Sequence, residues 1–144
     1  YLRELLGRED GAPPPVDLAV ERRNGDFVRN LIQSGQVSVV HDLSDGGLIA
    51  ALAEMTLAAG VGAQLLVDDE LPPHAWLFGE DQGRYLVATP AADALLAAAE
   101  ASGVPARIVG EAGGEALARP GLFSLGLDRL RAAHEGWMPA FMGD

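Results

Sequence analysis

Hydrophobic and polar positions near the middle of this chain predict a strand, a turn and a helix in succession. Residues 37–40 form an apolar run broken by one serine, which indicates a buried strand. From residue 48 to residue 59, apolar side chains recur every three to four positions, the spacing of an amphipathic helix. The positions that carry this stripe are Leu48, Leu52, Met55 and Ala59. Gly60 then ends the predicted helix, and residues 61–67 read as the next strand.

The part of the chain before this strand reads as an extended segment followed by a helix. The opening YLRELL looks like the middle of a helix and the chain lacks an initiator methionine, so we expect a piece of a longer protein. Three consecutive prolines then favour an extended conformation. Residues 16–34 have a helical pattern, which Gly35 ends. We therefore predict a linker or extended segment over residues 1–15 and a single domain over residues 16–144.

Strand and helix patterns continue to alternate in the second half of the chain. Residues 84–89 have the alternation of a strand, and residues 91–103 form a helix rich in alanine and leucine. Residues 106–110 are predicted to be another short strand. Residues 116–127 contain at least one more strand, which Pro120-Gly121 interrupts.

The last segment is predicted to be a helix over residues 127–141, with an inner face made of Leu127, Leu130, Ala133 and Trp137. Strands and helices alternate, yet the later strands lie close enough in sequence for antiparallel pairing. The predicted fold class is therefore α/β (α+β), with a mixed β-sheet and helices packed on its faces. Strand order and oligomeric state stay open.

Composition narrows the classes of partner. The 144 residues are 49% hydrophobic, which is typical of a globular chain, and the formal net charge is −11. This charge disfavours binding to nucleic acid or to an anionic membrane surface. No apolar run approaches the roughly 20 residues that span a bilayer. The chain has no cysteine, so disulfides and thiolate metal sites are excluded, as suits a reducing compartment such as the cytoplasm.

The turn between residues 40 and 48 carries the most informative polar residues. Asp42 follows the predicted strand, Ser44 and Asp45 come next, and the adjacent glycines Gly46 and Gly47 open the helix. A glycine in a helix costs roughly 0.5–1 kcal/mol relative to alanine, so a pair is not there for stability. Glycine lets another group approach the backbone closely, and the free amides of a helix N-terminus attract anions. This pattern predicts a site for a phosphate, or for a metal-bound phosphate held with Asp42.

A structural interpretation of the same turn stays open beside the functional one. Ser44 and Asp45 are good N-cap residues, and two glycines allow a tight turn that packs helix and sheet closely together. Glycine-rich turns that open helices are common in α/β proteins. The sequence pattern does not decide between the two interpretations.

A second polar cluster, GEDQGR over residues 79–84, immediately precedes a predicted strand. Glu80 is suited to Mg²⁺ or to ribose hydroxyls, Gln82 to a bidentate amide contact, and Arg84 to phosphate. The alternative is an ordinary hydrophilic turn in which Arg84 pairs with Glu80 on the surface. The functional interpretation gains weight if this cluster and the glycine turn belong to the same sheet.

Other polar residues give weaker signals. The three histidines, His41, His74 and His134, have no zinc-site spacing. Adjacent strand residues point to opposite faces, so His41 and Asp42 cannot both face one pocket. The acidic residues 68–70 read either as metal ligands or as a solvated turn. The sequence lacks the GxSxG, GxxxxGK[ST] and GxGxxG patterns of hydrolases, P-loop proteins and dinucleotide-binding proteins.

Two motifs together resemble a known family. The stretch VVHDLSDGGLIAALAEM, followed by LFGEDQGRYLV, is similar to the C-terminal domain of the synthetase component of phosphoribosylformylglycinamidine synthase. GREDGAPPPVDL, ERRNGDFV and LRAAHEGWMPAFM are also similar to that family, so the resemblance covers nearly the whole chain. Either main motif alone indicates only the wider superfamily that includes aminoimidazole ribonucleotide synthetase and selenophosphate synthetase.

The resemblance implies a fold, a reaction and a set of site residues. Such enzymes use ATP and Mg²⁺ to phosphorylate the amide oxygen of formylglycinamide ribonucleotide, and ammonia from glutamine then replaces the phosphate. This chain resembles the last of four domains in the synthetase component, with an aminoimidazole ribonucleotide synthetase C-terminal-domain-like fold. Asp42 matches a metal-binding Asp, and Glu80 with Gln82 match a substrate-binding pair. The chain departs from the family pattern at His41, where the first half of the enzyme has Gln, and at Asp81, where it has Ser.

The resemblance also implies partners and leaves alternatives open. The expected partners are the remaining domains of the synthetase, the glutaminase and small accessory subunits, in the cytoplasm, with neither nucleic acid nor membrane. Because most of the family's catalytic residues lie in other domains, we expect the isolated chain to be inactive. The alternatives are a non-catalytic scaffolding or nucleotide-binding module, and a sister synthetase that forms an acyl phosphate or a selenophosphate.

Overall fold

A computed structural model describes residues 2–9, 11–66 and 71–143 of the chain. The chain divides into two compact units. The first comprises Tyr1–Ala51 and Asp69–Arg107, and the second comprises Leu52–Asp68 and Ile108–Asp144. The predicted acidic loop at residues 68–70 lies outside the described residues.

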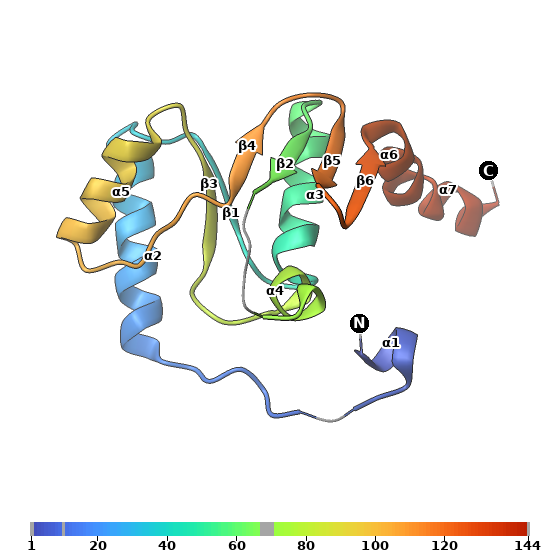
Figure 1. The fold of residues 1–144 in the computed structure, drawn as a ribbon, viewed down its shortest axis with the longest axis horizontal. Helices are drawn as coiled ribbons and strands as arrows, with labels where there is room; N and C mark the ends of the chain where they lie inside the picture. The colour runs from blue at the N-terminus through green and yellow to red at the C-terminus, as the bar shows by residue number, and fades with distance from the viewer. Residues whose placement is uncertain (1, 10, 67–70, 144) are drawn as a thin grey trace. The chain divides into compact units, whose positions relative to one another are not determined.

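The first unit is built around a two-stranded antiparallel ribbon (Figure 1). Strand β1 pairs with β3, so that Val39 lies opposite Ala88 and Asp42 lies opposite Tyr85. The elements of this unit are α1 (Leu2–Leu6), α2 (Leu18–Gln33), β1 (Val39–Asp42), the start of α3 (Gly47–Ala59), α4 (Pro73–Phe78), β3 (Tyr85–Ala88) and α5 (Ala92–Ala101). Its buried apolar residues are Val28, Leu31, Val37, Leu48, Ala51, Trp76, Leu77, Ala99 and Val104.

Local sequence explains where α2 begins and ends. The Asp17 carboxylate accepts hydrogen bonds from the amides of Ala19 and Val20 at 2.9 and 3.1 Å, which satisfies two amides of the first turn. At the other end, Gly35 has a φ of +69°, a conformation that glycine adopts without strain. The amide of the next residue then reaches back to the carbonyl of Leu31 at 3.0 Å and closes the helix. The predicted end of this helix at Gly35 is confirmed.

The second unit contains a four-stranded mixed sheet in the order β4-β2-β5-β6. The β2 and β5 strands are parallel, whereas β2–β4 and β5–β6 are antiparallel. Leu65 on β2 and Leu117 on β5 are its most buried large side chains. The remaining elements are the rest of α3, β2 (Ala63–Leu65), β4 (Gly110–Ala112), β5 (Ala116–Arg119), β6 (Phe123–Gly126), α6 (Leu127–Glu135) and α7 (Trp137–Met142).

The Pro120-Gly121 pair makes the turn between β5 and β6. Gly121 has a φ of +77°, and the amide of Leu122 donates to the carbonyl of Arg119 at 3.0 Å. Proline at the second position and a left-handed glycine at the third are features of a type II β-turn. The interruption predicted within residues 116–127 is therefore a hairpin between two strands.

The mixed α and β composition is confirmed, but several predicted details are wrong. The strands form two separate sheets instead of one, and the strand predicted at residues 106–110 lies at Gly110–Ala112 instead. The strand predicted at residues 37–40 starts at Val39 and runs through Asp42, because pairing with β3 sets its register. The strand predicted at residues 61–67 is confirmed for Ala63–Leu65, and residue 67 lies outside the described part of the chain.

The predicted C-terminal helix is two helices that meet at Gly136. Leu127 and Leu130 are half-buried, in line with the predicted inner face. The prediction is wrong for Ala133 and Trp137, which are exposed, since α7 continues past the end of the packed α6 face. Among the helices of residues 2–9, 11–66 and 71–143, none has the length and apolarity needed to cross a bilayer.

Candidate functional site

The two polar loops predicted from sequence meet at one end of the β1–β3 ribbon. Antiparallel strands place the end of one beside the start of the other. Asp42 ends β1 and lies opposite Tyr85, which begins β3. The loop that follows β1 and the loop that precedes β3 therefore emerge side by side. The cluster at residues 79–84 and the glycine turn therefore belong to the same sheet, which was the condition for the functional interpretation of that cluster to gain weight.

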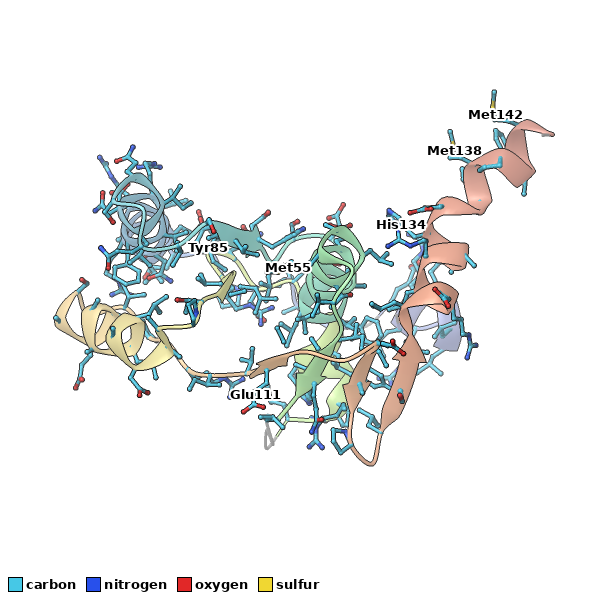
Figure 2. The ribbon with its side chains drawn as sticks, turned by 90° about the horizontal axis from the view of Figure 1, so that it is seen from above. Met55, Tyr85, Glu111, His134, Met138 and Met142 are labelled. Carbon is cyan, nitrogen blue, oxygen red and sulfur yellow. The ribbon has the colours of Figure 1, made fainter. Side chains whose placement is uncertain are left out.

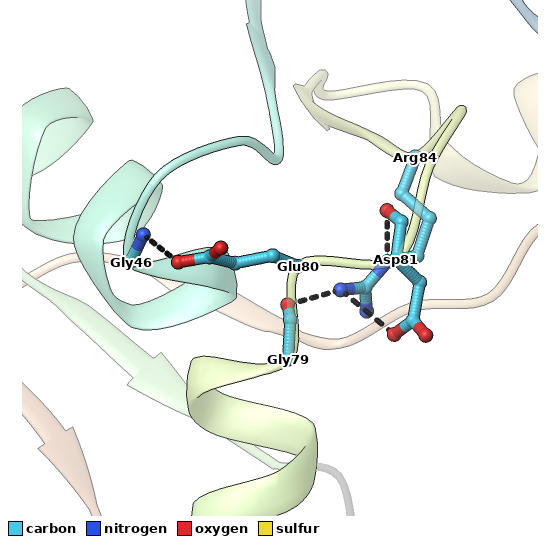
Figure 3. Close-up of polar contacts among 5 residues, drawn as sticks. All are labelled: Gly46, Gly79, Glu80, Asp81 and Arg84. Atoms are coloured by element: carbon cyan, nitrogen blue, oxygen red, sulfur yellow. Dashed lines mark hydrogen bonds and ion pairs between the residues drawn. The ribbon is translucent and has the colours of Figure 1, made fainter. Parts of the chain in front are cut away.

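A hydrogen bond joins the two loops directly. The amide of Gly46 donates to Oε1 of Glu80 at 2.9 Å (Figure 3). The next amide, that of Gly47, donates to the carbonyl of Ser44 at 3.0 Å within the same turn. A carboxylate therefore does occupy the start of α3, as the helix dipole favours, but it belongs to the protein itself.

The second glycine of the pair allows close packing against α4. A Cβ built on Gly47 would lie 2.6 Å from the carbonyl oxygen of Gly79 and 2.8 Å from the carbonyl carbon of Phe78. Gly47 also has a φ of +66°, and Gly46 has a φ of +82°. The close backbone approach predicted for the glycine pair is thus made by the end of α4.

Arg84 holds the second loop in shape. Its Nη2 donates to the carbonyl of Gly79 and lies 3.2 Å from Oδ2 of Asp81 (Figure 3). Its Nε donates to the carbonyl of Asp81 at 3.3 Å. The ion pair that the sequence suggested between Arg84 and Glu80 is replaced by one with Asp81. The guanidinium that the sequence offers to phosphate is therefore engaged within its own loop.

Helix α2 packs against the same loop. Nδ2 of Asn24 donates to the carbonyl of Gly83 at 3.0 Å. Gly25 makes room for Tyr85, because a Cβ at Gly25 would lie 3.1 Å from the Tyr85 hydroxyl. Both Asn24 and Gly25, in the middle of α2, therefore have a packing role.

An open cleft of about 790 Å³ lies between α2 and the two loops. Its lining includes six of the eight predicted site residues, namely Asp42, Ser44, Asp45, Glu80, Gln82 and Arg84. Gly46 and Gly47 are not among the lining residues; they lie where the loops contact each other. The lining residues that sequence reasoning missed are Pro14, Leu18, Glu21, Arg22, Gly25, Asp26, Arg29, Leu43, Gly83 and Tyr85.

A signal for the missed cleft-lining face of α2 was present in the charge pattern. Arg22, Asp26 and Arg29 are spaced four and three residues apart, so they share one face of α2. The Arg22 Nε lies 3.8 Å from Oδ2 of Asp26, and Nη1 of Arg29 donates to Oδ1 of the same carboxylate. A charged face at this spacing usually indicates solvent exposure, which is why it did not mark a cleft.

The donor set for a divalent cation is incomplete in the described part of the chain. Among the described residues, no three His, Cys, Asp or Glu side chains are grouped closely enough to hold a metal ion. Asp42 is exposed at the end of β1. Nδ1 of His41 lies 3.8 Å from the Asp42 carboxylate and 2.6 Å from the Asp42 carbonyl oxygen. A magnesium ion at Asp42 would therefore take most of its oxygen ligands from a phosphate, from water or from groups other than the described residues.

Residues 1–119 match the family model described as AIR synthase related protein, C-terminal domain. The chain belongs to this family. The superfamily resemblance stated from the two motifs is thereby confirmed. The family model ends at residue 119, so β6, α6 and α7 lie beyond the matched region.

The chain is also similar to curated relatives that are named enzyme subunits. The chain is 62% identical over 142 residues to the phosphoribosylformylglycinamidine synthase subunit PurL of Caulobacter vibrioides. The match covers 99% of this chain and 19% of that protein. A second relative of the same name, from Methylocella silvestris, is 56% identical over 144 residues. The chain spans about a fifth of the length of the curated relatives it matches.

Solved structures confirm the fold. Thermotoga maritima PurL complexed with FGAR superposes with a TM-score of 0.71 at 20% identity, over 88% of this chain and 23% of that one. The complex of the same protein with ATP gives a TM-score of 0.64 at 20% identity, over 76% of this chain and 21% of that one. The predicted aminoimidazole ribonucleotide synthetase C-terminal-domain-like fold is confirmed.

We predict that Gly47→Ala destabilises the chain more than Gly35→Ala. Both glycines have φ near +67°, so both substitutions carry a left-handed strain of about 1–2 kcal/mol. Only Gly47 faces backbone atoms closer than 3.0 Å to the added Cβ, whereas Gly35 has open space. Overpacking should add about 1–3 kcal/mol to the loss at Gly47. Urea denaturation followed by circular dichroism measures the difference, and equal losses would contradict the packing role.

We also predict that Glu80 protects the Gly46 amide from hydrogen exchange. Glu80→Ala removes the acceptor, so this amide should exchange faster. Glu80→Gln keeps an oxygen acceptor and should leave most of the protection in place. The expected loss of unfolding free energy for Glu80→Ala is at most about 1 kcal/mol, because the bond is exposed. Unchanged exchange of Gly46 in Glu80→Ala would show that this bond does not hold the turn.

Proposed function

We propose that this chain is the C-terminal domain of the second half of a phosphoribosylformylglycinamidine synthase synthetase component. The longer protein would convert formylglycinamide ribonucleotide to formylglycinamidine ribonucleotide, with ATP and Mg²⁺, in purine biosynthesis. The observation that carries this proposal is 62% identity to a protein of that name over 99% of the chain. Residues 16–144 would act as one domain of it, and residues 1–15 would connect to the preceding domain.

The geometry supports a role in positioning a ligand more than a role in covalent chemistry. Phosphoryl transfer depends mainly on orientation and on neutralised charge. The cleft offers the Asp42 carboxylate, the Ser44 hydroxyl and the Gln82 amide on a braced pair of loops. We assign Asp42 a share in holding Mg²⁺, and Ser44, Asp45, Glu80, Gln82 and Arg84 a share in shaping the ligand site, with Gly46 and Gly47 at the contact between the loops.

The proposal also covers where and with what the protein works. The partners would be the remaining domains of the synthetase, a glutaminase that supplies ammonia, and small accessory subunits, all in the cytoplasm. The names of the curated relatives favour this reaction over a sister synthetase that forms an acyl phosphate or a selenophosphate. An acidic chain with a net charge of −11 is a poor partner for nucleic acid or an anionic membrane.

A second candidate function is a scaffolding module without a ligand. It is favoured by the Gly46–Glu80 bond, because an internal carboxylate already satisfies the amide that a phosphate would use. The scaffolding function is also favoured by Arg84, because its guanidinium group already pairs with Asp81. Titration calorimetry of the 144-residue chain with Mg²⁺-ATP and with Mg²⁺-ADP separates the two candidates. A scaffold gives no heat of binding with either nucleotide, and a ligand site gives heat that Asp42→Asn reduces.

We predict that the longer polypeptide containing this chain forms formylglycinamidine ribonucleotide from ATP, Mg²⁺ and ammonia, whereas the isolated chain forms none. The reason is that the described residues contain no complete group of metal ligands. Gln82→Ala in the longer polypeptide should lower kcat/KM by roughly 10-fold, the effect of losing one polar contact worth about 1.4 kcal/mol.

Gln33→Ala is the matched control, because Gln33 is exposed at the end of α2 and lies outside the cleft lining. Product is measured by chromatography against an authentic standard. Turnover by the isolated chain would refute its dependence on other domains. An unchanged kcat/KM in Gln82→Ala would favour the scaffolding function.

A further inference from the structure

Helix α7 presents a fully apolar surface at the end of the second unit. Its sequence, WMPAFM, contains no charged side chain. The rings of Trp137 and Phe141 stack nearly parallel, with centroids 5.0 Å apart. Met138 and Met142 project on the same side as each other (Figure 2). The exposed fractions of these four residues, 62%, 71%, 56% and 69%, are high for such large side chains.

This exposure is unusual in physical terms. Isolated helices shorter than about 12–15 residues are marginal in water, and most helical stability in proteins comes from packing of an apolar face. α7 has six residues. Trp, Phe and Met are the residues enriched at the centres of protein interfaces. Exposed contiguous apolar surface therefore marks a contact that the chain alone does not make.

Of the two C-terminal helices, only α7 is free of charged side chains. The preceding helix α6 carries Asp128, Arg129, Arg131, His134 and Glu135 over nine residues. Nη1 of Arg131 pairs with Glu135 at 2.7 Å, and its Nη2 donates to the carbonyl of Leu57 at 3.0 Å. The hydrogen bond from Arg131 to the Leu57 carbonyl thus anchors helix α6 to the end of α3, and the apolar surface of α7 begins after Gly136.

An exposed apolar helix can bind a membrane, a second copy of the chain or another part of the same polypeptide. Charge argues against the first two. Helices that lie on membranes combine an apolar face with Lys and Arg, which α7 lacks. The net charge of −11 repels anionic lipid and also repels a second copy of the same chain. Charge repulsion matters less for a surface in another part of the same polypeptide, because the covalent connection already holds the two parts close together.

We propose that Trp137, Met138, Phe141 and Met142 pack against an apolar surface in another part of the same polypeptide, outside residues 1–144. The chain accounts for only 19% of the length of the Caulobacter vibrioides relative, so most of such a protein lies outside it. The match to that relative covers 99% of the chain, α7 included, whereas the family model ends at residue 119. Helix α7 is therefore an addition to the family domain that belongs to the longer synthetase. The inference rests on the proposed function in that it takes the chain as one domain of such a protein.

Hydrogen exchange of the peptide 137–143 tests this interface. In the isolated 144-residue chain its amides should exchange close to the rate of an unstructured peptide. In the longer polypeptide without added subunits, they should exchange at least roughly tenfold more slowly, since packing suppresses local opening. Equal exchange in the two proteins would overturn the proposal. Protection that grows with concentration of the isolated chain, or that needs a separately added subunit, would overturn it in favour of a second copy or a subunit.

A substitution tests whether the apolar side chains of α7 cause the protection from hydrogen exchange. Phe141→Ser in the longer polypeptide should return exchange of the peptide 137–143 to the rate seen in the isolated chain. Ala140→Ser, on the same helix, is the control and should leave exchange unchanged. Activity is measured in parallel. An active polypeptide with an unprotected α7 contradicts this inference alone, whereas an inactive polypeptide with a protected α7 contradicts the proposed function alone.

Discussion

The pairing of β1 with β3 is the constraint on which the site depends. Opposing Asp42 to Tyr85 places the glycine turn and the 79–84 loop at the same end of one ribbon. A two-stranded ribbon is marginally stable by itself, so this register needs support from what packs on it. That support comes from three sides: the Asn24 contact to Gly83, the backbone of α4 against Gly47, and the Glu80 bond to Gly46.

These supports are made by the same residue types that would otherwise bind a ligand. Glu80 satisfies the amide at the start of α3, and Arg84 satisfies the carbonyl of Gly79 while it pairs with Asp81. Each polar group that holds a loop in place is less available to an incoming molecule. Of the polar side chains on the two loops, Asp42, Ser44, Asp45 and Gln82 line the cleft without bracing the other loop. The braced loops thus form a frame, and these four side chains are the polar groups of the loops that it leaves to the cleft.

The sequence identified the two polar loops but left open whether they meet and which contacts they make. Strand periodicity and turn glycines are local signals, so β1, β3 and the helix after Gly47 could be placed within two residues. The contact of Gly47 with the end of α4 joins residues about thirty positions apart, and no local pattern encodes such a contact. The same limit applies to α2, whose charged face is typical of a solvent-exposed surface in the sequence. Only the structure shows that this helix packs on the loop, where Asn24 donates a hydrogen bond to the Gly83 carbonyl. At the C-terminus, apolar spacing predicted burial for Trp137, because spacing reports which side of a helix is apolar and not whether a partner is present.

The charge balance of the cleft sets the kind of ligand it can accept. Its lining carries five carboxylates, on Glu21, Asp26, Asp42, Asp45 and Glu80, against three guanidinium groups, on Arg22, Arg29 and Arg84. All three arginines already pair with carboxylates, two with Asp26 and one with Asp81. A bare phosphate would meet net negative charge and would have to break one of these pairs. A phosphate that arrives with a divalent cation brings its own compensation, and the Asp42 carboxylate then becomes a favourable neighbour instead of a repulsive one.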